Sequence, residues 1–240
     1  MCQAGPGAME GVEVWWSSLD RPADEVAELS RYLDDAELHR ASQFQNARDR
    51  RRFIVSRGIL RSLLGDYTAT TPDRVAIRIL PGGKPVLVDD VDSARLHFSL
   101  SHCDDMIALA FSSTEVGIDI QRQEDFEDMP RVVANFFSPE EAITFEHLAD
   151  HERSHFFFRT WVRKEAYTKA TGQGLAIEPS TLTVSTLPSS SVRITREDNS
   201  VYLDDRYQIH EIDGLAGYSA AVAVASGSWN VVKPVTRSFP

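Results

Sequence analysis

Apolar and polar residues alternate with a period of two in several short stretches of this chain, which is the pattern of strands with one buried face. Residues 12–16 form the first such stretch. Residues 96–102 (LHFSLSH) form a clearer one, in which the apolar side chains point to one face while His97, Ser99 and Ser101 point to the other. Both stretches therefore predict strands.

Four more segments predict strands by alternation or by apolar content. They are residues 74–80 (RVAIRIL), 106–111 (MIALAF), 116–120 (VGIDI) and 217–226 (GYSAAVAVAS). Turn-forming residues 112–115 separate the second segment from the third, so the sequence predicts that these two strands form a β-hairpin. The tail from residue 227 carries no clear signal.

Apolar residues three and four positions apart predict helices. The first helix begins near residues 21–24, and a longer one is expected over about 36–65. Residues 138–141 (SPEE) have the serine cap, the early proline and the third-position glutamate of a helix start. A last helix is expected over residues 151–171, and it ends at Gly172.

The order of these elements contains a faint internal repeat. A long helix followed by strands ending in IALAFSS recurs as a long helix followed by strands ending in SAAVAVAS. Chance similarity between strands of small residues would explain the repeat equally well. We expect an α+β fold with an N-terminal half over residues 1–115, a C-terminal half over 116–226 that carries a metal site, and a tail over 227–240.

The composition and charge of the chain argue against several classes of protein. The 240-residue chain has a formal net charge of −11, which argues against general nucleic-acid binding because that needs a basic surface. No apolar run is long enough to span a membrane, and the N-terminus lacks the features of a signal peptide. Cys2 and Cys103 are too few for a disulfide framework, so a cytoplasmic location is expected.

Lysine is rare in this chain, and its placement is informative. The chain has only four lysines among 25 basic residues, yet Lys164 and Lys169 flank Glu165 in one predicted helix. A lysine ammonium is a compact, flexible point charge, so this placement suggests a chemical role. A routine ion pair between Glu165 and Lys169, four residues apart, is the structural alternative. That alternative leaves both Trp161 and the preference for lysine unexplained.

An aspartate in the strand 116–120 is the second unusual feature. Asp119 shares a face with Gly117 and Gln121, and aspartate is a poor strand former. A structural aspartate bonded to a loop amide is the alternative interpretation. Two carboxylates, Asp119 from a strand and Glu165 from a helix, would suit Mg²⁺, which commonly takes one or two protein carboxylates together with water and phosphate oxygens.

Three further features could bind anions. Residues 81–85 (PGGKP) form a glycine-rich turn around Lys84, although Pro85 stands where a Walker A loop has serine or threonine. Ser101-His102 ends a strand where a loop could present an imidazole, and a packed histidine fits equally well. The helix expected over 36–65 has a cationic side, made of Arg40, Arg48, Arg50, Arg51, Arg52, Arg57 and Arg61.

Taken in order, five motifs resemble those of the Sfp-type 4′-phosphopantetheinyl transferases. They are GKP, FSLSH, VGIDI, FFSPEE and WxxKEAxxKxxGxGL, and the resemblance is strong from about Arg40 to Leu175. The family transfers the phosphopantetheine arm of coenzyme A to a serine of a carrier protein, uses Mg²⁺, and releases adenosine 3′,5′-bisphosphate. Its fold is a pseudo-two-fold pair of similar α+β halves with the site at their junction, and we expect a monomer.

The resemblance implies roles for particular residues. Asp119 and Glu165 would be metal ligands, and Gln121 stands where many members have a third acidic ligand. Lys169 and His102 would contact the pyrophosphate, and Glu165, or a water beside it, would take the serine proton. The coenzyme A contacts that it implies are Arg40, Arg48, Arg52, Lys84, Ser101, His102, Lys164 and Lys169.

Other interpretations stay open at this point. Gln121 would also suit a non-catalytic module that binds coenzyme A or a nucleotide on the same scaffold. A Mg²⁺-dependent phosphohydrolase would explain the acidic residues but not GKP or Ser101-His102. Glu141 fits a capping box slightly better than a catalytic role. The sequence does not say whether the carrier serves fatty-acid, polyketide or nonribosomal peptide synthesis, and it predicts neither a nucleic-acid nor a membrane partner.

Overall fold

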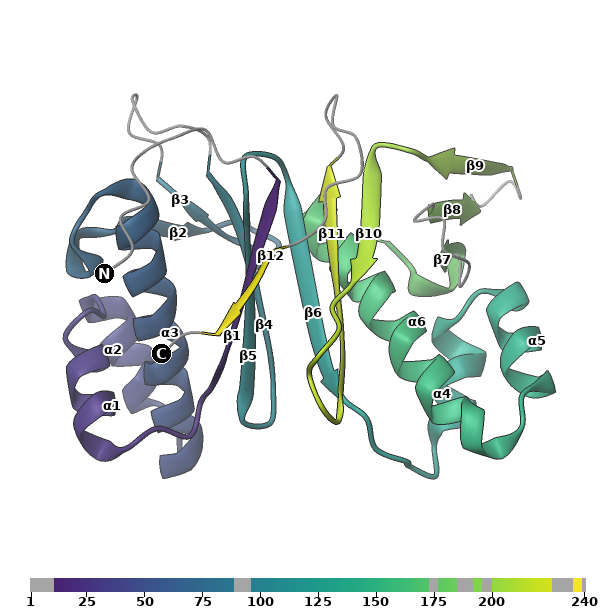
Figure 1. The fold of residues 1–240 in the computed structure, drawn as a ribbon, viewed down its shortest axis with the longest axis horizontal. Helices are drawn as coiled ribbons and strands as arrows, with labels where there is room; N and C mark the ends of the chain where they lie inside the picture. Colours follow the sequence, from purple (N-terminus) through teal and green to yellow (C-terminus); the bar gives the residue numbers. More distant parts are fainter. Residues whose placement is uncertain are drawn as a thin grey trace.

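The computed structural model describes residues 11–88, 96–172, 177–184, 192–195, 200–225 and 235–238. It confirms a fold that mixes helices and strands. Figure 1 shows helices α1–α3 on one side, helices α4–α6 on the other, and two sets of long strands side by side between them. None of the described helices has both the length and the hydropathy that a membrane span requires.

The elements of the first part of the chain are β1 (Val12–Ser18), α1 (Ala23–Ser30), α2 (Asp35–Ser42), α3 (Ala47–Thr68), the 3₁₀ turn η1 (Pro72–Arg74), β2 (Ile77–Ile79), β3 (Pro85–Leu87), β4 (His97–Cys103) and β5 (Met106–Ser112). Those of the second part are β6 (Val116–Arg122), α4 (Met129–Phe136), α5 (Pro139–His147), α6 (Asp150–Thr171), the 3₁₀ turn η3 (Pro179–Thr181), β7 (Leu182–Val184), β8 (Val192–Thr195), β9 (Val201–Asp204), β10 (Tyr207–Glu211), β11 (Tyr218–Ala225) and β12 (Val235–Ser238).

One four-stranded sheet lies beside α3, with strand order β12-β1-β5-β4. β5 runs antiparallel to both of its neighbours, β1 and β4, whereas β12 runs parallel to β1. Apolar residues of α3, such as Ile59 and Leu60, form a core with Phe98 and Phe111 from the strands. The tail, which carries no clear signal in its sequence, therefore supplies an edge strand to the N-terminal sheet.

A second sheet, with strand order β10-β11-β6, packs against α6. Both neighbours of β11 run antiparallel to it. Apolar residues of α6, among them Val162, Ala166 and Tyr167, pack on Ala221 and Ala223 of β11. Two smaller sheets, β2-β3 and β7-β8-β9, lie outside these main sheets.

The predicted hairpin of β5 and β6 is wrong. β6 pairs with β11, and the tight hairpin joins β4 to β5, where Cys103 opposes Met106. Asp104 occupies the turn with φ of 51°, a conformation that aspartate tolerates better than most residues. Residues 112–115 instead carry the chain from one sheet to the next, a difference that turn composition alone does not reveal.

The helix expected over residues 36–65 is two helices, α2 and α3. Asn46 breaks it, because its side chain accepts a hydrogen bond from the Arg48 amide and so caps a new helix. The other helix predictions are confirmed. α5 begins with the expected capping box of Ser138 and Glu141, and α6 spans residues 150–171 with Gly172 as its left-handed cap.

Candidate active site

The candidate site forms where β6 touches α6. A Cβ atom added to Gly117 would lie 2.1 Å from the Ala166 carbonyl oxygen and 2.2 Å from the Ala170 amide nitrogen. Real Cβ atoms essentially never approach so closely, so only glycine fits at this position. The contact brings Asp119, two residues further along β6, beside the face of α6 that carries Glu165 and Lys169.

A buried hydrogen-bonded cluster joins three elements at this contact. The Lys169 ammonium lies 2.6 Å from Asp119 Oδ1 and donates a 2.9 Å hydrogen bond to Ser101 Oγ. Ser101, on β4, in turn donates to Asp119 Oδ1 at 2.7 Å. Asp119 is only 1% exposed, whereas Lys169 is partly exposed. The lysine therefore binds the buried carboxylate while its ammonium stays within reach of a ligand.

Glu165 adds a second carboxylate to the cluster. Burial raises the pKa of Glu165, and the nearby charge of Asp119 raises it further, while Lys169 opposes both effects. No group in the described part of the chain donates a hydrogen bond to the Glu165 carboxylate. The negative charge of Glu165 therefore lies close to that of Asp119, and Lys169 offsets only part of the repulsion. A cation placed between these two carboxylates would relieve that repulsion.

These residues fit a hard cation such as Mg²⁺. The Gln121 amide nitrogen donates to Asp119 Oδ2 at 3.2 Å, which places the amide beside the carboxylate, as the alternation of β6 predicts. Among the described residues no group of three histidine, cysteine, aspartate or glutamate side chains could hold a metal. Two carboxylates and an amide oxygen still match the oxygen ligands of Mg²⁺, which keeps several waters or phosphate oxygens in its shell.

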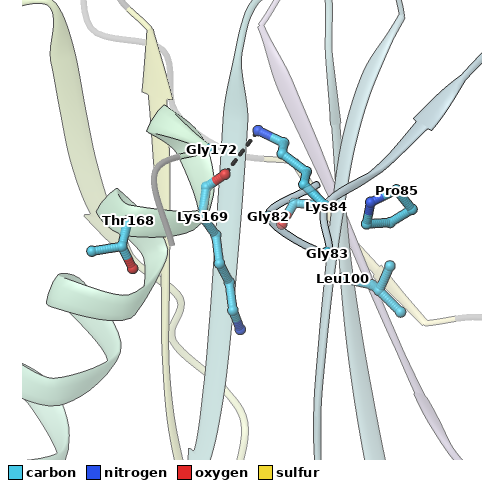
Figure 2. Close-up of a pocket in the computed structure, with 9 residues that line it drawn as sticks. Gly82, Gly83, Lys84, Pro85, Leu100, Thr168, Lys169 and Gly172 are labelled. Atoms are coloured by element: carbon cyan, nitrogen blue, oxygen red, sulfur yellow. Dashed lines mark hydrogen bonds between the residues drawn. The ribbon is translucent and has the colours of Figure 1, made fainter. Parts of the chain in front are cut away.

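A cavity of about 230 Å³ opens beside this cluster, between the glycine-rich turn of the N-terminal part and the end of α6. Figure 2 shows Lys169 and Thr168 of α6 on one side of it and the turn around Lys84 on the other. Its lining residues are Gly82, Gly83, Lys84, Pro85, Ser99, Leu100, Thr168, Lys169 and Gly172. The predicted GKP turn and the predicted helix thus meet at one cavity.

The Lys84 ammonium binds backbone carbonyl oxygens of the protein. Its ammonium donates to the carbonyl oxygens of Lys169 (2.8 Å), Ala170 (2.9 Å) and Val116 (3.4 Å), which uses all three of its hydrogens. The first of these bonds is drawn in Figure 2. A cation at the end of α6 is favoured by the helix dipole. A contact with coenzyme A from this residue would therefore come from the backbone of the turn.

Lys84→Met is expected to loosen the end of α6. Hydrogen bonds from a charged group contribute about 1.5–3 kcal/mol, so the melting temperature should fall by several degrees. If the ammonium instead contacts coenzyme A, the melting temperature would stay unchanged and only the KM for coenzyme A would rise. Calorimetry and steady-state kinetics on the same variant distinguish these two results.

A second cavity, of about 320 Å³, lies near α3 and the end of β4. Its lining residues are Leu19, Phe44, Asp49, Arg52, Phe53, His102 and Asp104. His102 follows Ser101 in β4, so their side chains point to opposite faces of the strand. In the structure His102 therefore lines the same cavity as Arg52 and Phe53, whereas Ser101 lies beside Asp119.

The predicted arginines gather near this second cavity. Arg48 and Arg52 both bind the Asp20 carboxylate, at 3.1 Å and 3.0 Å, and they lower the pKa of Asp20 to about 2. The Arg40 guanidinium lies 5.9 Å from the centre of the Phe53 ring. Of the three arginines, Arg52 lines the cavity itself.

Comparison with known proteins identifies the family of this chain. A family profile described as "4′-phosphopantetheinyl transferase, N-terminal" matches residues 17–114, and one described as "4′-phosphopantetheinyl transferase superfamily" matches residues 115–223. The 4′-phosphopantetheinyl transferase HetI of Nostoc sp. is 38% identical over 69% of this chain and 70% of its own. The chain belongs to the 4′-phosphopantetheinyl transferase superfamily.

Two other members of the superfamily match with lower identity. The 4′-phosphopantetheinyl transferase Sfp of Bacillus subtilis is 24% identical over 89% of this chain and 92% of its own. The L-aminoadipate-semialdehyde dehydrogenase-phosphopantetheinyl transferase of Rattus norvegicus is 28% identical over 76% of this chain and 62% of its own. The family resemblance carried by the sequence motifs is confirmed.

In this member of the superfamily, Lys164 does not reach the site. Lys164 is 2% exposed, and its ammonium lies 2.7 Å from Glu141 Oε2 and donates to the carbonyl oxygens of Pro179 and Leu182. Successive helical residues point about 100° apart, so Lys164 cannot share the direction of Glu165. The coenzyme A contact predicted for Lys164 is therefore not supported.

Glu141 is a structural residue in this arrangement. One of its oxygens accepts from the Ser138 amide and the other from the Val184 amide, both at distances below 3 Å. The side chain is buried and also binds Lys164. These contacts confirm the predicted capping box.

Sequence reasoning missed two contributions to the site. Gly117 was noted only as a member of one face of β6, although a glycine inside a strand often marks a close approach of another backbone. Ser99 was expected on the polar face of β4. The sequence did not predict that its hydroxyl would accept a hydrogen bond from the Ile118 amide, at 3.2 Å. The last residues of the motif, 173–175, lie outside the described ranges.

Proposed function

We propose that this chain transfers the 4′-phosphopantetheine arm of coenzyme A to a serine hydroxyl of an apo-carrier protein, with Mg²⁺ as cofactor, and releases adenosine 3′,5′-bisphosphate. The observation that supports this most is the cluster of Asp119, Lys169 and Ser101 beside Glu165, whose carboxylate accepts no hydrogen bond from the described residues. It combines the groups that a pyrophosphate and a dication need, and it lies beside the cavity at the GKP turn.

In this proposal Asp119, Glu165 and Gln121 hold the metal. When bound, Mg²⁺ would neutralise the charge that develops on the leaving bisphosphate. Asp119 is fixed by Ser101 and Lys169, so it would offer a preorganised oxygen ligand. The raised pKa of Glu165 reflects a charge that is costly without a cation and favourable with one.

The other residues would orient coenzyme A and move the proton. Arg52 lines a cavity suited to the 3′-phosphate end, with Arg40 and Arg48 nearby, and His102, which lines the same cavity, would contact the pyrophosphate. Lys169 would bind the pyrophosphate. The carrier serine oxygen bonds to the β-phosphorus while the bond from that phosphorus to the bridging oxygen breaks, and the leaving bisphosphate keeps that oxygen. Glu165, or a water beside it, would take the serine proton.

The fold features implied by the family stay proposals. Each main sheet packs one long helix, α3 or α6, which supports a pseudo-two-fold pair of halves with a boundary near residues 115–116. β12 in the N-terminal sheet suggests that the tail completes the first half. A monomer in the cytoplasm remains the expectation, as does the absence of nucleic-acid and membrane partners.

Mass spectrometry of carrier proteins tests the proposed function. The protein is incubated with coenzyme A, Mg²⁺ and apo-carriers from fatty-acid, polyketide and peptide synthesis. We expect at least one carrier to gain a single phosphopantetheine, and the gain to be lost when the acceptor serine is replaced by alanine or the metal is chelated. Binding of coenzyme A without modification of any carrier would support the non-catalytic module that Gln121 suggests.

Gln121→Glu should lower the Mg²⁺ concentration that gives half-maximal transfer. A carboxylate offers a full charge to a hard dication, whereas an amide oxygen offers only a dipole. The maximal rate should change less, because the ion is present in both forms at saturation. A metal titration of the rate measures this, with Gln123→Glu, one residue beyond the end of β6, as the matched control. An unchanged metal requirement would mean that Gln121 does not point at the metal.

A further inference from the structure

Asp20 binds two of the arginines near the second cavity, and none of the five sequence motifs includes it. It accepts two hydrogen bonds from Arg52, from Nε at 3.0 Å and from Nη2 at 3.1 Å. A third comes from Arg48 Nη2, also at 3.1 Å. Asp20 and Arg52 thus form a bidentate pair, which fixes the direction of the guanidinium plane. Because Asp20 lies between β1 and α1, it holds these arginines of α3 from a different part of the chain.

The Asp20 carboxylate keeps two like charges side by side. Arg48 and Arg52 are four residues apart on α3, a spacing at which like charges repel each other. Hydrogen bonds from Arg52, and then from Arg48, lower the pKa of Asp20 to about 2, so this carboxylate is ionised at neutral pH. One anion therefore offsets the repulsion between the two cations and orders both side chains.

Both arginines keep hydrogen-bond donors that a ligand can reach. Arg52 lines the cavity of about 320 Å³, whereas Asp20 does not. Arg52 Nη1 makes no hydrogen bond within the described part of the chain, and it is not one of the buried unpartnered atoms there. The Arg48 side chain is 59% exposed, and among the described residues its guanidinium donates from Nη2 alone. The carboxylate thus occupies one edge of each guanidinium and leaves the rest accessible.

The acidic residues around the cavity do not balance its arginines completely. The three arginines expected to bind coenzyme A carry three positive charges, and the carboxylates of Asp20 and Asp49 oppose them. Asp104, the other acidic lining residue, is paired with Arg122 at 3.5 Å. One positive charge is therefore left for an incoming phosphate.

We propose that Asp20 is a positioning residue for coenzyme A, which holds Arg48 and Arg52 in the orientation that binds the 3′-phosphate. The inference rests on the proposed function, which places that phosphate at this cavity. A side chain that is already ordered loses less conformational entropy when it binds a ligand. Asp20 therefore strengthens the preference of the protein for coenzyme A over 3′-dephospho-coenzyme A, although it touches neither ligand.

Asp20→Asn tests this role by calorimetric titration of the full chain with coenzyme A and with 3′-dephospho-coenzyme A, at one Mg²⁺ concentration. The variant keeps the size of the side chain and loses the charge that orders the arginines. Since ordering a long side chain weakens binding by roughly two- to tenfold, two such side chains should lower the affinity for coenzyme A about five- to twentyfold. The affinity for 3′-dephospho-coenzyme A should stay unchanged, whereas a general loss of structure would weaken both ligands alike.

Two further variants serve as controls. Asp20→Glu keeps the carboxylate and should recover part of the preference for coenzyme A. Asp24→Asn removes an exposed carboxylate that binds no arginine within the described ranges, and it should keep the whole preference. The Asp20 side chain is 47% exposed, so Asp20→Asn should fold, and melting curves check this for each variant.

The outcomes separate this inference from the proposed function. If the wild type prefers coenzyme A and Asp20→Asn prefers it equally, the positioning role alone is overturned. Tighter binding of coenzyme A by Asp20→Asn would also overturn it, because the carboxylate would then compete with the phosphate. A wild type that binds both ligands equally would overturn the placement of the 3′-phosphate and this inference with it. Transfer to carriers is a separate measurement, so its failure would leave the binding result standing.

Discussion

Asp119→Asn and Glu165→Gln should each reduce transfer to a carrier protein by about 10²–10³-fold or more, the loss typical when one preorganised electrostatic group is removed from a reaction centre. Each variant keeps the size of the side chain and removes one of the two charges that would hold the cation. Rates at saturating coenzyme A and Mg²⁺ measure the effect. Glu140→Gln, an exposed carboxylate on α5, is the matched control and should transfer normally. Wild-type turnover by Asp119→Asn would contradict the assignment of Asp119 as a metal ligand.

The same Glu165→Gln variant should gain stability in the absence of metal. The folded-state pKa of Glu165 is raised above its ordinary value of 4.5, so ionising this carboxyl costs folding free energy. Below the ordinary pKa the wild type and the variant should melt alike. As the pH rises through the window between the ordinary and the raised pKa, the wild type should lose stability relative to the variant. Added Mg²⁺ should restore stability to the wild type and not to Glu165→Gln. Melting curves between acid and neutral pH, with and without Mg²⁺, would show this.

The parts of the site that sequence could predict depend on local periodicity. Alternation along β6 fixes which side of the strand Asp119 and Gln121 share, and a spacing of four fixes the common face of Glu165 and Lys169. Both rules are independent of the rest of the fold. The meeting of these two faces was implied by the family motifs rather than by periodicity, and the structure brings them within hydrogen-bond distance.

The predictions that the structure does not support concern contacts between residues that are distant in the sequence. The pairing of β6 with β11 joins residues about a hundred positions apart, and the composition of a turn carries no information about such pairing. Lys164 belongs to the family motif, yet its ammonium binds Glu141, which comes from another helix. The coenzyme A contact of Lys84 was likewise implied by the family motif that its turn matches. Where its ammonium binds depends on where α6 ends in space.

Gly117→Ala should affect both folding and catalysis, because the added Cβ would overlap backbone atoms of α6 rather than a flexible side chain. Overpacking typically costs about 1–3 kcal/mol, and this backbone overlap should cost about 3 kcal/mol or more. For a chain of this size that corresponds to a fall in melting temperature of about 6–12 °C. α6 must also move away from β6, which separates Glu165 and Lys169 from Asp119. The folded variant should therefore transfer poorly and need more Mg²⁺.

Gly65→Ala separates these two effects. Its added Cβ would lie 2.6 Å from the Thr70 carbonyl oxygen, a comparable backbone overlap at the end of α3 and outside the residues of the catalytic cluster. This variant should lose stability while each folded molecule keeps its transfer rate and its Mg²⁺ requirement. Melting curves give the stability of both variants, and rates normalised to the folded fraction give their catalysis. Gly117→Ala with a normal Mg²⁺ requirement would show that the close contact of β6 and α6 serves packing alone and does not set the distance between the two carboxylates.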